Sequence, residues 1–284
     1  MKEELPIGVM VRFGTPPAAS FKRLRDLGLH ACQICAPPDS YLYGAEGRRN
    51  TAELKEAIRD YEIEVTSLFI SWPDQRWKDH VYSIGLVPEE TRAARLVRAC
   101  RSADWGRELG IEQIASHVGA VPEDPELRLW QDFARDLKAF VKFLGANGQT
   151  LCYETGMESL AGLRALVDAV GEENQGLNFD PANLLIYNQD DPMKFVEEFG
   201  TRILHLHCKD ACRPADGRKL GRETRLGEGD TRFVELFGKL YALGYRGPLT
   251  IEREIPPGGE LDRDVADAIA LLNQLKAKML CAER

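Results

Sequence analysis

The feature that most constrains the fold is an alternation of short apolar segments with longer amphipathic segments, repeated about eight times along the chain. The apolar segments have the composition of buried strands, and the segments between them space their apolar residues like one face of a helix. We expect strands over residues 6–13, 31–36, 64–71, 111–120, 149–156, 176–185, 202–208 and 247–254. We expect helices over residues 21–29, 51–61, 88–109, 124–148, 159–171, 191–200, 231–244 and 264–280.

This order of elements predicts an α/β protein with a parallel sheet, because strands that alternate with helices pair side by side in one direction. Eight such units in 284 residues fit a single (β/α)₈ TIM barrel better than an open doubly wound sheet. The open sheet of a dinucleotide-binding protein would need a glycine-rich turn after the first strand, where this chain has GTPPAAS. No linker rich in Pro, Gly or Ser divides the chain, so we expect one domain over residues 1–284.

Charge and cysteine usage limit the partners and the compartment. The net charge of −8 argues against nucleic acid and anionic membrane, since both select for a basic surface. The seven cysteines are an odd number and lie scattered, which is typical of reduced thiols in a cytoplasmic protein. No signal peptide and no apolar run of membrane-spanning length is present. We expect a small-molecule ligand, and the sequence leaves a homo-oligomer open.

Ionisable side chains gather where the expected strands end. The stretch from Arg202 to Arg213, RILHLHCKDACR, changes abruptly from apolar to charged, and His205 and His207 share one face of its strand. In parallel barrels the functional residues collect at the carboxyl ends of the strands. The polar residues at these ends are His117 on the fourth strand, Glu154 and Glu158 on the fifth, Asp180 and Asn183 on the sixth, His207, Lys209 and Asp210 on the seventh, and Glu252 and Glu254 on the eighth.

Four of these residues form a ligand set when they converge at one barrel mouth. Glu154, Asp180, His207 and Glu252 supply three carboxylates and one imidazole. Three buried carboxylates repel one another, and a divalent cation removes that conflict. Oxygen-rich ligation with one imidazole suits Mn²⁺, Mg²⁺ or Co²⁺, with Zn²⁺ as a further candidate. Each residue taken singly is also compatible with a strand cap or an ion pair.

The motifs YETG, NFDPAN, HLHCKD, LGEGD and GPLTIERE resemble the xylose isomerase-like TIM-barrel superfamily, whose sugar (phosphate) isomerase and epimerase branch includes D-tagatose 3-epimerases and inosose dehydratases. The resemblance implies that Glu154, Asp180, His207 and Glu252 hold one metal ion. It also implies that Glu154 and Glu252 act as catalytic acid and base. If His207 is a ligand, its second ring nitrogen should meet a hydrogen-bonding partner.

The remaining candidates are substrate-binding residues. The resemblance assigns Arg213, six residues after His207, to substrate. The chain departs from the ketose 3-epimerases at Asn183, where they carry histidine, and at Glu158, which follows Glu154 by four residues instead of six. His117 and Lys209 at strand ends, and Trp72 after the third strand, complete the expected set. Barrel packing and ion pairing are the competing interpretations of these three residues.

Two reactions fit this site. The first is a sugar or sugar-phosphate isomerisation or epimerisation, in which a proton leaves and returns next to a carbonyl through an enediolate. The alternative is a dehydratase or lyase acting on a keto-inositol, a keto-sugar or a related polyol. An apurinic endonuclease would need more than the five histidines present and a basic face. A non-catalytic sugar-binding barrel would not need the four candidate ligands.

Overall fold

The computed structural model describes residues 3–76, 83–215 and 219–281. Eight parallel strands close into a barrel in the order β1-β10-β7-β6-β5-β4-β3-β2. The strands are β1 (Ile7–Val11), β2 (Ala31–Cys35), β3 (Glu64–Phe69), β4 (Gln113–Ser116), β5 (Thr150–Glu154), β6 (Gln175–Phe179), β7 (Ile203–Cys208) and β10 (Leu249–Ile251). The (β/α)₈ architecture expected from the alternating pattern is thereby confirmed.

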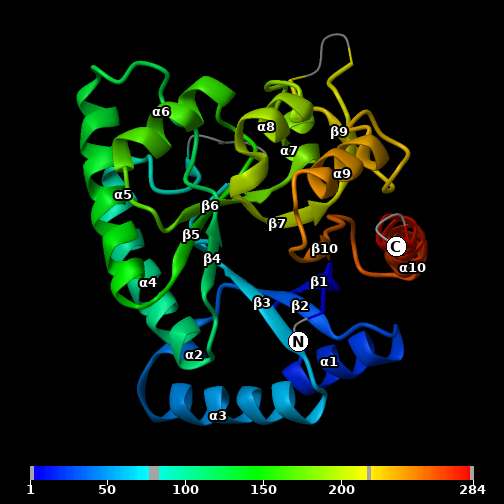
Figure 1. Ribbon diagram of the computed structural model, residues 1–284. Helices are drawn as coiled ribbons and strands as arrows, with labels where there is room; N and C mark the ends of the chain where they lie inside the picture. Colours follow the sequence, from blue (N-terminus) through cyan, green and yellow to red (C-terminus); the bar gives the residue numbers. More distant parts are fainter. Residues whose placement is uncertain (1–2, 77–82, 216–218, 282–284) are drawn as a thin grey trace.

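Helices surround the barrel (Figure 1). The longer ones are α1 (Pro17–Asp26), α3 (Gly44–Asp60), α4 (Glu89–Glu108), α5 (Arg128–Ala146), α6 (Leu160–Val170), α8 (Pro192–Phe199), α9 (Phe233–Ala242) and α10 (Gly259–Cys281). An ion pair between Arg23 of α1 and Asp262 of α10 links the first and last helices of the ring. None of the described helices has the length and apolar character that crossing a membrane requires.

Helix α5 illustrates why these segments fold as they do. Its buried side chains are Trp130, Phe133, Ala134, Leu137, Phe140, Val141 and Leu144. They recur at intervals of three and four residues, which places them on one side of a helix. That side packs into the hydrophobic core, while the charged residues between them face solvent. Burial of such a stripe against the strands stabilises the helix more than its intrinsic propensity does.

The sixth strand is shorter than predicted. A strand was expected over residues 176–185, but β6 ends at Phe179 and a short helix, α7 (Pro181–Ile186), follows at once. Asp180 caps this helix by accepting hydrogen bonds from the backbone N–H groups of Ala182 and Asn183. Pro181 sits in the first turn, where its fixed φ favours a helix and its missing N–H costs nothing. The same two residues that end the strand therefore begin the helix.

Two elements after the seventh strand were also missed. The segment was expected to be a polar loop, but β8 (Asp210–Cys212) and β9 (Arg222–Thr224) pair as an antiparallel two-stranded sheet outside the barrel.

A short helix near the start of the chain was missed as well. This one-turn helix, α2 (Asp39–Leu42), precedes α3, which begins at residue 44 and not at 51. Strands of three residues and helices of one turn are too short for a hydrophobic period to show.

Candidate active site

The four predicted ligands lie together at the carboxyl end of the barrel. Glu154 is the last residue of β5, Asp180 follows β6, His207 lies near the end of β7 and Glu252 follows β10. One ligand atom from each residue lies within 4.8 Å of the others. Parallel strands bring their carboxyl ends to one rim, so residues more than ninety positions apart meet here.

His207 turns one ring nitrogen toward the three carboxylates. Its Nδ1 atom lies 3.0 Å from Oε1 of Glu154, 3.2 Å from Oε2 of Glu252 and 3.6 Å from Oδ2 of Asp180. The imidazole is fully buried. The lone pair of a neutral Nδ1 facing three oxygens is unfavourable unless a positive charge lies among them, either a proton on the ring or a bound cation.

The two carboxylate oxygens of Asp180 have different surroundings. Oδ1 caps α7, whereas the fully buried Oδ2 accepts no hydrogen bond and faces the cluster. Nζ of Lys209 at 3.5 Å and Nδ1 of His207 at 3.6 Å make no hydrogen bond to it, so this buried oxygen can take a closer partner. A cation held between Asp180, Glu154, Glu252 and His207 would supply it, with three oxygen donors and one nitrogen donor as hard divalent ions prefer. The residues present therefore fit the expected metal ion.

The electrostatics of the cluster also favour added positive charge. Burial raises the pKa of Glu154 to about 7, although His207 works against that rise. Burial alone would lower the pKa of His207, but the carboxylates of Glu154 and Glu252 outweigh it and raise this pKa well above its usual value. Glu252 has a lowered pKa because Lys209 and His207 together exceed the opposing effect of its burial.

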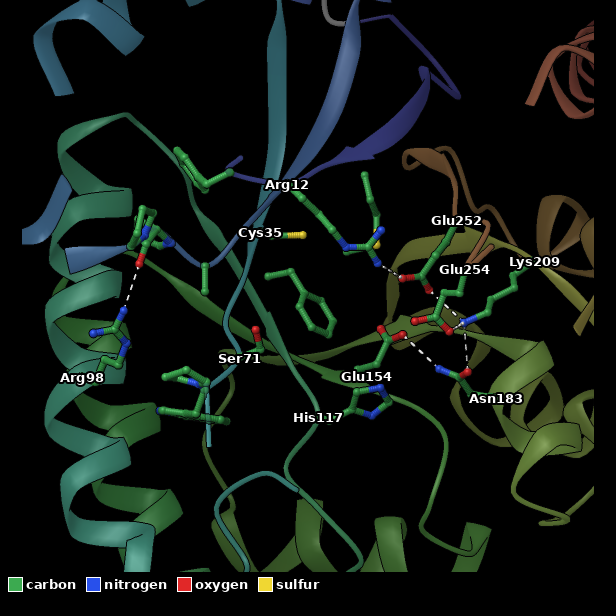
Figure 2. A pocket seen from close by; sticks show the side chains of 18 of the residues that line it. Arg12, Cys35, Ser71, Arg98, His117, Glu154, Asn183, Lys209, Glu252 and Glu254 are labelled. Atoms are coloured by element: carbon green, nitrogen blue, oxygen red, sulfur yellow. Dashed lines mark hydrogen bonds and ion pairs between the residues drawn. The ribbon is translucent and has the colours of Figure 1, made fainter. Parts of the chain in front are cut away.

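Lys209 is the second positive centre of the site. Its side chain is only 1% exposed, and Nζ lies 3.1 Å from Oε2 of Glu252, 2.7 Å from Oε2 of Glu254 and 3.5 Å from Oδ2 of Asp180. It also donates to Oδ1 of Asn183 at 3.2 Å. Figure 2 shows the Lys209 side chain extending between Glu252, Glu254 and Asn183. The ion pairing proposed for Lys209 as a competing interpretation is present, and the ammonium group nevertheless borders the pocket.

A cavity of about 630 Å³ opens over the cluster. Its lining includes the expected residues Trp72, His117, Glu154, Asn183, Lys209 and Glu252. Burial lowers the pKa of His117 to about 3, so this ring is neutral near pH 7. The indole of Trp72 donates to the carbonyl of Arg95 at 3.0 Å, which fixes the ring at the wall. Apolar side chains such as Phe69 share the lining with charged ones such as Arg12 and Glu254, which suits a polar small molecule.

Two expected substrate-binding residues lie elsewhere. The carboxylate of Glu158 is buried and accepts hydrogen bonds from the backbone N–H groups of Gly156 and Met157, each at 3.1 Å. The exposed guanidinium of Arg213 donates to the carbonyls of Gln189 and Asp190. Neither residue is among those lining the cavity. Glu158 binds the loop after β5, and Arg213 binds the loop that follows β6 and α7, so the contacts of both residues are structural.

Sequence reasoning missed three residues that the fold brings to the site. Arg12, just after β1, lies 3.5 Å from Oε1 of Glu252 and lines the cavity (Figure 2). Gln33 of β2 places Oε1 at 2.7 Å from Nε2 of His207. Asn178 of β6 donates to Oε2 of Glu154. Gln33 and Asn178 belong to barrel strands and Arg12 directly follows one, so only the alternation of inward-facing positions along the strands could have indicated them.

The glycine-rich LGEGD segment has a structural role. It wraps around the buried carboxylate of Asp210, which accepts hydrogen bonds from the N–H groups of Gly227 and Gly229 and from both the N–H and the hydroxyl of Thr231. A Cβ atom on Gly229 would lie 2.2 Å from Oδ1 of Asp210, so the close approach requires glycine. The backbone donors that could cradle a phosphate are therefore directed at a side chain of the chain itself.

Comparison with known proteins agrees with the architecture. A solved xylose isomerase domain protein from Planctomyces limnophilus is 29% identical, with 99% of each chain covered and a TM-score of 0.88. A xylose isomerase-like TIM barrel protein from Mycobacterium smegmatis, solved with magnesium, is 14% identical with a TM-score of 0.72 over 99% of this chain and 100% of that chain. At 14% identity the second likeness shows the fold alone.

Curated relatives are more distant. Rhizopine catabolism protein MocC of Rhizobium meliloti is 27% identical over 239 residues, which cover 75% of this chain and 70% of that protein. Inosose dehydratase of Clostridium tetani is 25% identical over 144 residues, which cover 45% of this chain and 48% of that enzyme. The sequence profile of one family, described as xylose isomerase-like TIM barrel, matches residues 21–275. Since that match spans most of the barrel described above, the chain belongs to the xylose isomerase-like TIM-barrel family.

Proposed function

We propose that this protein is a divalent-metal-dependent isomerase or epimerase acting on a small carbohydrate. The observation that carries the proposal is the convergence of Glu154, Asp180, His207 and Glu252, of which Glu154 and Glu252 line the cavity. Mn²⁺, Mg²⁺ and Co²⁺ are the ions that this donor set favours. When bound, such an ion would polarise a substrate carbonyl and stabilise negative charge on the neighbouring oxygens.

Glu154 and Glu252 are the residues proposed to move the proton. They stand on β5 and after β10, strands separated in the barrel by β6 and β7, and both line the cavity. A sugar bound between them would present opposite faces of one carbon to the two carboxylates. One carboxylate removes the proton next to the carbonyl, and the other returns a proton to the opposite face, which inverts the carbon. His117 and Asn183 line the cavity as hydrogen-bonding partners for sugar hydroxyls.

A dehydratase is the second candidate, and Lys209 favours it. The Nζ atom borders the cavity and carries a proton within 3.1 Å of Glu252. After proton abstraction, an ammonium group at this position could donate a proton to a departing β-hydroxyl, which would leave as water. The partial match to an inosose dehydratase supports the same candidate. An unsaturated ketone product, seen by its ultraviolet absorbance, would support this candidate over the first.

Solvent exchange tests the proposed function. The Mn²⁺-loaded protein is incubated in D₂O with a panel of ketohexoses and ketohexose phosphates, and loss of the carbon-bound proton is followed by NMR. Exchange is expected with at least one sugar, and Glu154→Gln should slow it by about 10²–10⁴-fold. Glu112→Gln, an exposed carboxylate beside β4, serves as the matched control. Exchange that continues at the original rate in Glu154→Gln would contradict the proposed role.

A further inference from the structure

Beneath the cluster, two buried amides connect the imidazole ligand to a carboxylate ligand. We infer that Gln33 and Asn178 form an amide relay that holds His207 in the tautomer protonated at Nε2, so that Nδ1 is left to bind the cation. The inference rests on the proposed metal site and makes Gln33 and Asn178 positioning residues. Neither lines the cavity, so they would act through His207 and Glu154 and not through the substrate.

The relay is closed off from solvent. Gln33, Asn178 and His207 are 0% exposed, and Glu154 is 1% exposed. Gln33 belongs to β2 and reaches His207 on β7, although β1 and β10 separate these strands in the ring. Buried polar groups without water must satisfy one another, so the direction of each hydrogen bond is determined by its neighbours.

The carboxylate of Glu154 sets the direction of the whole relay. A Glu154 carboxylate that binds a cation is ionised and can only accept, so the group of Asn178 that faces it must be the Nδ2 amide. Oδ1 of Asn178 then faces Gln33 and accepts from its Nε2 at 3.0 Å. The same Nε2 donates to Oγ of Ser67 at 2.5 Å. Both donors of the Gln33 amide are thereby used, which leaves its Oε1 as the atom that faces His207.

The contact at His207 then has one consistent protonation. Oε1 of Gln33 lies 2.7 Å from Nε2, and an amide oxygen accepts only, so Nε2 carries the proton. Nδ2 of Asn178 also lies 3.0 Å from Nε2. If Asn178 donated a hydrogen bond to Nε2, that nitrogen would carry no proton. Its lone pair would then face the lone pairs of Gln33 Oε1 at only 2.7 Å, which is repulsive. The oxygen contact therefore keeps a proton on Nε2, and Nδ1 is the nitrogen whose lone pair becomes available to a cation.

Nδ1 is the nitrogen that points at the cluster, 3.0 Å from Glu154 and 3.2 Å from Glu252. Histidine binds a metal through its unprotonated nitrogen, and the partner of the other nitrogen fixes the ring. The amide relay thus orients two ligands at once, since Asn178 also holds the second oxygen of Glu154. Loss of either amide should therefore reduce the free energy of metal binding by more than it reduces the free energy of unfolding of the ion-free protein.

Replacement of Gln33 tests this inference. Gln33→Met keeps the side-chain volume but removes both ends of the amide, and the dissociation constant for Mn²⁺ is expected to rise about 10–100-fold. Gln33→Glu should give an intermediate affinity, because a protonated carboxyl reproduces the acceptor toward Nε2 and the donor toward Asn178. The matched control is Gln175→Met, a buried amide at the far end of β6 that binds Tyr153 and two backbone carbonyls. The control should change Mn²⁺ affinity less than twofold.

A folded Gln33→Met protein that binds Mn²⁺ within twofold of the wild type would overturn the relay. If Gln33→Met does not fold, ¹⁵N spectra of the histidine rings in the wild-type protein decide instead. The ring of His207 is expected to keep its Nε2 proton in the ion-free and the Zn²⁺-loaded protein alike. A His207 ring without a proton on Nε2 would overturn the inference. Absence of Mn²⁺ binding by the wild type would refute the proposed function, while the ring spectrum would still test the relay.

Discussion

The Nζ atom of Lys209 lies 3.1 Å from Oε2 of Glu252, in a place where the lysine side chain is almost fully enclosed. An ammonium group is rarely buried so deeply unless several carboxylates surround it. Glu254 and Asp180 are the other two, at 2.7 and 3.5 Å. The lysine and the proposed cation therefore neutralise the same carboxylates and should influence each other.

This competition predicts the effect of Lys209→Met. Removing the ammonium leaves buried carboxylates unpaired, so the free energy of unfolding should fall by about 3–5 kcal/mol in the ion-free protein. Saturating Mn²⁺ should recover part of this loss, because the ion neutralises Glu252 and Asp180. Urea unfolding with and without Mn²⁺ measures both values. Lys239→Met, which removes a surface ion pair with Glu197, is the control and should cost about 0–1 kcal/mol.

An equal loss of stability in Lys209→Met with and without Mn²⁺ would show that the lysine and the ion do not share their partners. The proposed position of the cation would then be wrong even if the protein binds metal.

Asp210 should be important for stability and not for chemistry. Its buried carboxylate accepts hydrogen bonds from the backbone of residues 211, 227, 229 and 231, so Asp210→Ala leaves several N–H groups unsatisfied. We expect a loss of about 2–4 kcal/mol in urea unfolding, with Mn²⁺ affinity unchanged. Asp124→Ala, in an exposed loop, should change stability by less than about 0.5 kcal/mol. Unchanged stability in Asp210→Ala would contradict this assignment.

Metal binding should weaken as the pH falls. Burial raises the pKa of Glu154 to about 7 in the ion-free protein, so below that pH the carboxyl holds a proton that the metal must displace. Affinity for Mn²⁺ should therefore be greatest above pH 7 and fall by about tenfold per pH unit below it for each proton released. Calorimetry in buffers of different ionisation enthalpy counts the protons. An affinity that is constant between pH 5 and 8 would exclude protonated ligands in the ion-free site.

The barrel could be predicted from sequence because its signals are local. Each strand and helix carries its own hydrophobic period, and polar residues such as Glu154 and Asp180 stand directly at strand ends. Closure of the sheet then follows from the number of units. The strand–helix boundary at Asp180 was missed because apolar residues continue through α7, although the Asp-Pro pair was a capping signal.

The surroundings of the cluster could not be predicted in the same way. Arg12 and Gln33 are more than 170 positions from His207, and nothing near them in the sequence marks them as partners of a site. They meet the cluster only because β1 and β2 close the ring next to β10. Arg213 shows the opposite case, since its spacing from His207 resembles the family while its guanidinium binds the loop at residues 189 and 190.

One divalent cation is proposed to bind Glu154, Asp180, His207 and Glu252 together. Anomalous diffraction at the manganese edge from Mn²⁺-soaked crystals tests it directly. One strong peak is expected at about 2.0–2.3 Å from a carboxylate oxygen of each acidic residue and from Nδ1 of His207. A peak elsewhere with none at these four residues, or no peak at all at saturating Mn²⁺, would contradict it.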